Sequence, residues 1–366
     1  MTDSRALDPT DTAHQLAAAI DDVFALDHIV TGSSDGRRIR LHGQLLIESQ
    51  QAYSHIAKQF RAYGYTPILR SHSGGVAITA IPTVFASRSS RNLVALLLFA
   101  LTVLSVLFVG AGAQAPDLQW ILEHPLAGWP FAASLMAILT AHELGHYFVA
   151  RWFGVAVSLP YFIPMPFSPF GTMGAVIRTR APIHNRRQLL AIGAAGPLAG
   201  LAVAVPLLVM GLMQSEVHPI PLQPGVFMEG NSLFYAAVKF LLFGQFLPHG
   251  GTDVFLHPVA FAAWAGLLVT ALNLIPAGQL DGGHIAYALL GRRTLWLNRL
   301  AVLLALVMGL IWSGWFTWAA ILFLFGQRSA EPLDDVTRLT RRQRAFAIGM
   351  LLLFAVLFTP VPMIVL

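Results

Sequence analysis

The sequence predicts an all-α polytopic membrane protein that begins with a small soluble α+β domain. Hydrophobic residues make up 56% of the 366 residues and charged residues only 11%, against about 25% in an ordinary soluble domain. From about residue 92 onward the apolar residues form long runs, several of which reach the roughly 20 residues that a transmembrane helix needs. We therefore expect residues 1–90 to form a soluble cytoplasmic domain and residues 91–366 to form the membrane domain.

The first 90 residues show both helical and strand-like patterns. They predict, in order, a helix over 15–26, a strand over 38–47, a helix over 48–63 and strands over 65–69 and 76–81. Gly64 is a plausible helix cap, and Ser73-Gly74-Gly75 predicts a turn. No pattern of catalytic residues is recognisable in this part of the chain.

The rest of the chain is predicted to contain transmembrane helices and shorter apolar segments. Runs 93–113, 131–153, 189–213 and 258–275 predict transmembrane helices, and 345–358 begins a final one. Segment 233–246 is short and is predicted to be re-entrant. Segment 299–325 contains Ser313-Gly314 near its middle, which favours two short tilted helices over one kinked helix.

Segment 155–179 is apolar but is not predicted to be helical. It contains Pro160, Pro164, Pro166 and Pro169, and proline in a helix interior removes a backbone hydrogen bond and clashes with the preceding turn. Irregular backbone at membrane depth is tolerated only where it is buried in protein or lines a cavity. We expect one of these two environments for this segment.

The basic residues predict the orientation of the chain. Segments 1–91, 151–187, 284–299 and 328–344 hold 22 of the 23 Lys and Arg residues, whereas 114–130 and 214–231 hold none. Basic residues are enriched in cytoplasmic loops, so these four segments are assigned to the cytoplasm. Their spread through short loops also explains the pI near 9.9 without a nucleic-acid partner. We expect segment 328–344 to be solvated and to meet anionic headgroups.

Residues 142–146 read His-Glu-Leu-Gly-His, which is an H-E-x-x-H pattern. His142 and His146 share one face of a helix and lie about 6 Å apart along its axis, so both imidazoles can reach one metal ion. Glu143 follows the first ligand and can take a proton from metal-bound water. The alternative, two histidines exposed to headgroups, gives no reason for this spacing, and ionisable groups within an apolar helix are expensive to bury.

A zinc hydrolase needs a third protein ligand, and the chain contains no cysteine. Residues 273–284 break the preceding helix near Pro276 and contain Asp281 at the depth expected for the histidines. Asp281 is therefore a candidate ligand. It could equally be the N-cap of the helix that follows, and spacing alone does not separate these two roles.

Together these motifs resemble the site-2 proteases, the intramembrane zinc metalloproteases of peptidase family M50. The resemblance rests on 142–146 and 273–284, and it extends to 171–176 and 193–200. The last two segments, together with 177–182, are similar to the cyanobacterial and plant-plastid branch. The resemblance covers about residues 90–345.

The resemblance implies a three-helix metalloprotease core at about 127–290 with extra transmembrane helices. By matching position, His142, His146 and Asp281 would bind one Zn²⁺ per chain, and Glu143 would be the general base. No PDZ domain is evident. The expected location is the cell membrane, as a multi-pass protein with its N terminus in the cytoplasm, and we expect this membrane to be a bacterial inner membrane.

Further residues have a functional interpretation, a structural interpretation or both. Asn273 is a candidate hydrogen-bond donor to the oxyanion, or an amide that packs helices together. Gly171, Thr172, Met173 and Gly174 could present a strand edge to an unwound substrate, or belong to a structural loop. Gly196 and Gly200 predict close helix packing that would help to enclose the metal. His284 could orient a ligand or be a simple interfacial histidine.

The predicted function is zinc-dependent cleavage of transmembrane protein substrates within or near the lipid bilayer. A divalent-cation transporter is an alternative, but the ionisable residues cluster at one depth and offer no second site along a path. An inactive scaffold that binds membrane proteins is another alternative, although zinc binding alone would not need Glu143. The sequence indicates neither the substrate nor the oligomeric state.

Overall fold

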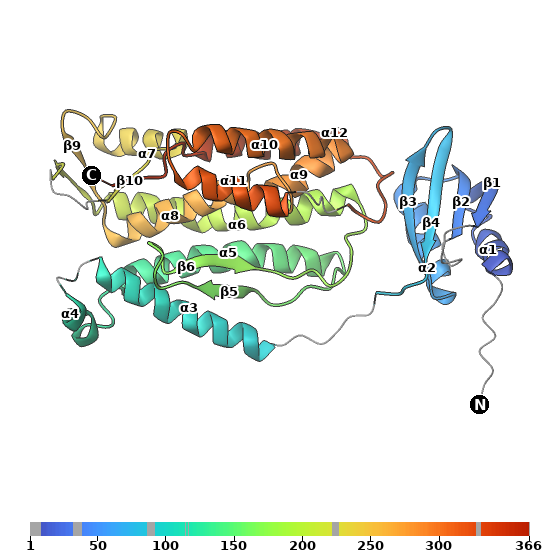
Figure 1. The fold of residues 1–366 in the computed structure, drawn as a ribbon, viewed down its shortest axis with the longest axis horizontal. Helices are drawn as coiled ribbons and strands as arrows, with labels where there is room; N and C mark the ends of the chain where they lie inside the picture. Colours follow the sequence, from blue (N-terminus) through green and yellow to red (C-terminus); the bar gives the residue numbers. More distant parts are fainter. Residues whose placement is uncertain are drawn as a thin grey trace. The chain divides into compact units, whose positions relative to one another are not determined.

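The structure is a computed structural model that describes residues 9–31, 39–85, 92–113, 115, 117–221, 227–326 and 331–365. The chain divides into two compact units (Figure 1). The first unit contains residues 1–88, 180–189 and 331–343, and the second contains residues 89–179, 190–330 and 344–366. The assignment of residues 1–90 to the cytoplasm stays a prediction, because it concerns the side of a membrane.

The first unit is built on a four-stranded antiparallel sheet in the order β1-β2-β4-β3. Its elements are α1 (Pro9–Ala18), β1 (Phe24–Thr31), β2 (Ile39–Leu45), α2 (Ser49–Ala62), β3 (Thr66–His72) and β4 (Gly75–Ile81). Apolar residues of both helices and of the sheet form one core, in which Leu16, Leu41, Ile56 and Ile78 are fully buried. The predicted helix over 15–26 is wrong beyond Ala18, because residues 24–31 pair with β2 instead. The long-range pairing overrides the helical spacing in this stretch.

Two segments that are distant in sequence complete the first unit. Leu69 of β3 forms a parallel bridge with Asp334, and Asp334 forms another with Asn185. Asp334 is fully buried and accepts hydrogen bonds from the Thr337 hydroxyl and from the backbone N–H groups of Val336 and Thr337. The expectation that all of 328–344 is solvated is therefore wrong for its central residues. The reason is that their partners come from parts of the chain more than 140 residues away.

The second unit is mostly helical. Its longer helices are α3 (Asn92–Gly112), α5 (Trp129–Trp152), α6 (Arg186–Leu212), which begins in the first unit, α8 (Pro258–Asn273), α10 (Thr294–Met308) and α12 (Arg341–Leu357). The shorter helices are α4 (Leu118–Glu123), α7 (Leu233–Phe243), α9 (Asp281–Leu290) and α11 (Gly314–Phe325), with a 3₁₀ turn, η1 (Gly291–Arg293), after α9. Among the described residues, α3 and α6 are long and apolar enough to cross a membrane. The expected split of 299–325 into two helices is confirmed.

Strands in the second unit make its fold mixed rather than all-α. They form three two-stranded sheets: β5 (Tyr161–Pro164) with β6 (Thr172–Val176), β7 (Glu216–Pro219) with β9 (Thr252–Phe255), and β8 (Phe227–Glu229) with β10 (Met363–Val365). The β5-β6 hairpin occupies the proline-rich segment, which confirms that this segment is not helical. Proline suits the edges of so small a sheet, where its missing N–H leaves no gap in a ladder.

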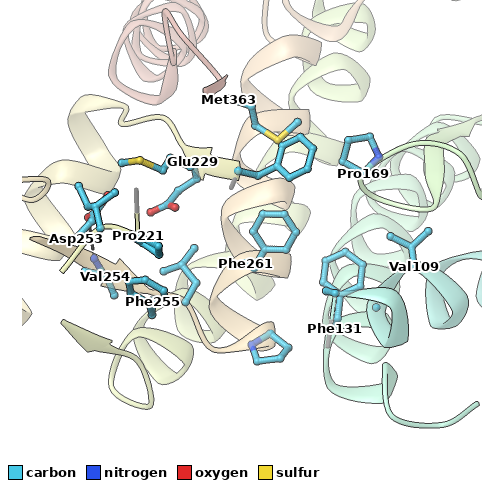
Figure 2. A pocket seen from close by; sticks show the side chains of 17 residues that line it. Val109, Phe131, Pro169, Pro221, Glu229, Asp253, Val254, Phe255, Phe261 and Met363 are labelled. Atoms are coloured by element: carbon cyan, nitrogen blue, oxygen red, sulfur yellow. Dashed lines mark hydrogen bonds between the residues drawn. The ribbon is translucent and has the colours of Figure 1, made fainter. Parts of the chain in front are cut away.

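A cavity of about 540 Å³ lies among the ends of α3, α5 and α8 and the small strands (Figure 2). Its wall is largely apolar, with Phe131 and Phe261 on one part and the carboxylates of Glu229 and Asp253 on another. The ammonium group of Lys239 is completely buried and lies 3.7 Å from Glu229 Oε1 and 3.4 Å from Asp253 Oδ1. Lys239 is therefore the countercharge for two carboxylates in this part of the protein.

Candidate metal centre

Helix α5 carries three of the predicted site residues on neighbouring turns. His142 and Glu143 are buried, with 3% and 7% of their surfaces exposed, in a helix whose other residues are largely apolar. The rings of His142 and His146 meet edge to face, with their centres 5.0 Å apart. The four-residue spacing therefore brings both imidazoles to one side of α5, as the sequence predicts.

Asp281 is brought to the two histidines at the start of α9. It is the first residue of this helix, and the N-cap position is occupied by Leu280, which makes no side-chain capping bond. The two roles that the sequence leaves open for Asp281 are thereby separated. Its carboxylate does not cap the helix; it faces the imidazoles of α5.

The distances from the carboxylate to the two imidazoles fit a tetrahedral metal site. Asp281 Oδ2 lies 3.2 Å from His142 Nε2 and 3.2 Å from His146 Nε2, and the three ligand atoms all lie within 4.8 Å of one another. Ligands bound to zinc at about 2.0–2.1 Å in a tetrahedron are separated by about 3.3–3.4 Å. Imidazole nitrogens and a carboxylate oxygen are also the donor types that zinc accepts when cysteine is absent.

A backbone carbonyl orients one of the imidazoles. His146 Nδ1 lies 2.7 Å from the carbonyl oxygen of Ile192 in α6. Since a carbonyl can only accept, Nδ1 must carry the hydrogen, which leaves the lone pair of Nε2 directed at Asp281 and the metal position. Hydrogen bonds of this kind fix the tautomer and the orientation of metal-binding histidines.

Helix α6 forms a wall of glycines against the histidines. A Cβ atom on Gly196 would lie 2.0 Å from His146 Nε2, and one on Gly200 would lie 3.2 Å from His142 Nδ1. On the facing side, a Cβ atom on Gly145 would lie 2.5 Å from the carbonyl oxygen of Ala195. The expected close packing of Gly196 and Gly200 is confirmed, and the rings of the two histidines occupy the space that side chains would otherwise fill.

Asn273 and His284 lie on the two helices that flank the loop before Asp281. Asn273 is the last residue of α8, and a Cβ atom on Gly282, next to Asp281, would lie 2.0 Å from the carbonyl oxygen of the neighbouring Leu274. His284 Nδ1 lies 2.8 Å from the carbonyl oxygen of Leu280, which is a backbone atom and not one of the predicted metal ligands. The general-base role of Glu143 and the oxyanion role of Asn273 stay predictions.

In the β5-β6 hairpin, the four candidate substrate-binding residues differ in their environments. Gly171 has a φ of +72°, and a Cβ atom there would lie 2.7 Å from Val106 of α3. Thr172 is buried and donates its hydroxyl hydrogen to the carbonyl oxygen of Ile163. Met173 is 61% exposed, and a Cβ atom on Gly174 would have no neighbour within 4 Å. Substrate binding by these residues stays a prediction.

Two features of the centre are not predicted from the sequence. One is the Ile192 carbonyl, since any residue could supply a backbone oxygen. The other is the role of Gly145, which is visible in the sequence as the small residue inside the H-E-x-x-H pattern but is interpretable only once its neighbour on α6 is known.

Comparison with known proteins places these residues in a family context. The profile described as "Peptidase family M50" matches residues 130–313. The chain is 34% identical over 230 residues to the "Probable zinc metalloprotease EGY2, chloroplastic" of Oryza sativa subsp. indica, which covers 62% of this chain and 41% of that protein. The protein of the same name from Arabidopsis thaliana is 32% identical over 288 residues, covering 78% and 50%.

A third relative is the "Probable zinc metalloprotease EGY1, chloroplastic" of Arabidopsis thaliana, which is 29% identical over 292 residues, covering 73% of this chain and 52% of that protein. The chain thus spans about half the length of the curated relatives it matches. No solved structure matches it significantly.

Proposed function

Since the chain belongs to peptidase family M50, we propose that it is a zinc-dependent endopeptidase that cleaves membrane proteins within or near the bilayer. The observation that carries the proposal is the convergence of His142, His146 and Asp281 from two helices, with Glu143 beside them. The relatives are named probable zinc metalloproteases, which supports the choice of metal.

In this proposal His142, His146 and Asp281 would hold one zinc ion per chain. When bound, zinc lowers the pKa of a water molecule to about 7 and polarises the peptide carbonyl. Glu143 takes a proton from the attacking water and later gives it to the leaving amine. Its buried position keeps it away from bulk solvent, so the proton is exchanged with the reacting groups.

Asn273 is proposed to donate a hydrogen bond from its side-chain amide to the oxygen that gains charge during attack. Preorganised donors of this kind are worth about 10²–10³ in kcat. The close approach of Gly282, next to Asp281, to the carbonyl oxygen of Leu274, which follows Asn273, supports the assignment.

The substrate is proposed to be a transmembrane protein that unwinds and adds as a strand to the β5-β6 hairpin near Gly171, Thr172, Met173 and Gly174. An exposed strand edge offers backbone hydrogen bonds to an extended peptide. Among the described residues, no further strand pairs with either edge of this two-stranded sheet, and Met173 is exposed. A helical substrate hides its peptide bonds, so strand addition would also make the scissile bond reachable.

The lipid bilayer is proposed as the surroundings of the second unit, with the chain as a multi-pass protein of the cell membrane and its N terminus in the cytoplasm. Helices α3 and α6, with mean hydropathies of 2.8 and 2.0, support this location. The concentration of Lys and Arg in four loops supports the orientation. A bacterial inner membrane fits this arrangement, and the names of the plant relatives point to the chloroplast for those proteins.

A direct test is to measure zinc content and cleavage of a model transmembrane substrate for the wild type and Glu143→Gln, purified as full chains. We expect one zinc per chain in both proteins and a loss of cleavage of about 10²–10⁴-fold in the variant, because it lacks the base. Glu123→Gln, an exposed change on α4, is the matched control and should cleave normally. Cleavage by Glu143→Gln at the wild-type rate would refute the proposed mechanism.

A further inference from the structure

The third ligand of the candidate metal centre is held by an irregular stretch of chain. Residues 274–280 connect α8 to Asp281 and form no regular helix or strand. Backbone hydrogen bonds within this stretch are local, such as Ala277 N–H to the Ile275 carbonyl and Leu280 N–H to the Ala277 carbonyl. Zinc bond lengths vary by only about 0.2 Å, so something beyond this loop must hold Asp281 in place.

Asn298 of α10 supplies such a restraint. Its side chain is buried, with 5% of its surface exposed. The amide oxygen accepts a hydrogen bond of 2.9 Å from Gly278 N–H, and the amide nitrogen donates to the carbonyl oxygen of Gly326, just after α11. A backbone N–H can only donate and a carbonyl can only accept, so the two partners fix which end of the amide is which.

Close backbone contacts transmit this restraint to the start of α9. Gly278 has a φ of +58°, and a Cβ atom on it would lie 2.6 Å from Gly326 Cα. A Cβ atom on Gly283 would lie 2.4 Å from the Gly278 carbonyl oxygen, and one on Gly282 would lie 2.0 Å from the Leu274 carbonyl oxygen. The loop and the first turn of α9 therefore contact each other through bare backbone, and the loop cannot shift without displacing Asp281.

The same two helices cover the loop with apolar side chains. Ile275 and Ala277 are buried in a cluster with Ala305 of α10 and with Trp315 and Leu322 of α11. Leu280, the residue before Asp281, packs against this cluster. The polar bridge of Asn298 thus reaches the same loop that this apolar cluster covers.

From these contacts we infer that Asn298 is a positioning residue for the third metal ligand, and that α10 and α11 brace the loop that carries Asp281. The inference rests on the proposed function, because it concerns the metal of that same centre. In this inference α10 and α11, which follow the ligand-bearing helices α5 and α9 in the chain, stabilise the metal centre. The side-chain amide of Asn298 bonds to Gly278 and Gly326, and it acts on the centre through Gly278 and the loop.

The test compares Asn298→Ala and Asn298→Asp with the wild type as full chains. Alanine removes both hydrogen bonds, whereas aspartate keeps the acceptor for Gly278 N–H and loses the donor to Gly326. Asn231→Ala is the matched control, since Asn231 also ties a loop, by donating to the Leu247 carbonyl, in a region that holds no metal ligand. The readouts are zinc affinity by chelator competition, the absorption spectrum with cobalt in place of zinc, and the melting temperature of the metal-free protein.

We expect a loss of zinc affinity of about 10- to 100-fold in Asn298→Ala, as for other residues that orient metal ligands, and a smaller loss in Asn298→Asp. The cobalt spectrum should change in both, and the Asn231→Ala protein should match the wild type. If Asn298→Ala fails to fold, the aspartate variant decides the matter. Zinc affinities within twofold of the wild type, with an unchanged cobalt spectrum, would overturn this inference and leave the proposed function standing. A wild type that binds no zinc would overturn both.

Discussion

Replacing Gly196 by alanine tests whether the metal centre depends on the bare backbone of α6. The added Cβ atom would lie 2.0 Å from Nε2, 2.4 Å from Cδ2 and 2.6 Å from Cε1 of His146. Non-bonded carbon atoms normally approach to about 3.5–4.0 Å. One partner must therefore move by about 1.5 Å for the substitution to be accommodated.

The surrounding contacts decide which partner moves. Helix α6 cannot easily retreat as a unit without opening its contact with α5, where Gly145 packs against the Ala195 carbonyl. We therefore expect the imidazole of His146 to move. This movement breaks its 2.7 Å hydrogen bond to the Ile192 carbonyl and takes Nε2 too far from the metal position to bind the metal. Loss of an orienting hydrogen bond alone costs about 10- to 100-fold in metal affinity. We therefore expect Gly196→Ala to lose at least about 100-fold, or about 2.8 kcal/mol.

The assay is zinc content after purification, followed by chelator competition on the purified full chain. Gly200→Ala is the graded control, because its Cβ atom would lie 3.2 Å from His142 Nδ1 and needs a shift of only tenths of an ångström. Gly349→Ala in α12 is the neutral control, with no atom within 4 Å. If Gly196→Ala retained wild-type zinc affinity, the glycine wall would not be the feature that admits the histidines.

Two other regions give separate predictions. Lys239→Met should lower the free energy of unfolding by about 3–5 kcal/mol, because it leaves the buried carboxylates of Glu229 and Asp253 without their countercharge. Denaturant titration measures this change. A change below about 1 kcal/mol would show that these carboxylates are neutral. In the first unit, burial lowers the pKa of His42 below its usual 6.5, so the unfolded chain binds the proton more readily and His42 reduces stability as the pH falls below about 6.5. Limited proteolysis of the sheet between pH 7.5 and 5.5 should therefore accelerate more in the wild type than in His42→Gln, and equal acceleration would contradict this account.

The centre could be predicted from the sequence because its determinants are local. A spacing of four residues on one helix sets the relative positions of His142 and His146. A helix break followed by glycines marks the segment that contains Asp281. Spacing could not decide between ligand and N-cap for Asp281, since a carboxylate at the first turn suits both roles. Only the position of α9 relative to α5 separates the two.

Contacts between distant segments account for what the sequence did not reveal. The helix predicted over 15–26 overlaps the start of β1, because the pairing of β1 with β2 is not encoded in the spacing of its own apolar residues. The burial of Asp334 depends on β3 and on Asn185, and the bridge of Asn298 depends on two glycines 20 and 28 residues away. Each of these features belongs to a pair of segments, and neither member carries a recognisable pattern alone.

The cost of burying polar groups explains why so much rigid backbone surrounds this centre. Two imidazoles and two carboxyl groups, those of Glu143 and Asp281, lie largely out of solvent within an apolar bundle. Burying an ionised group costs several kcal/mol unless it is paired, and a divalent cation compensates this cost only if all ligands reach it together. The glycines of α6 admit the imidazoles, and the α10-α11 brace holds the carboxylate. If either support were loose, the charges would stay buried without the ion that stabilises them, so metal binding depends on residues that never touch the metal.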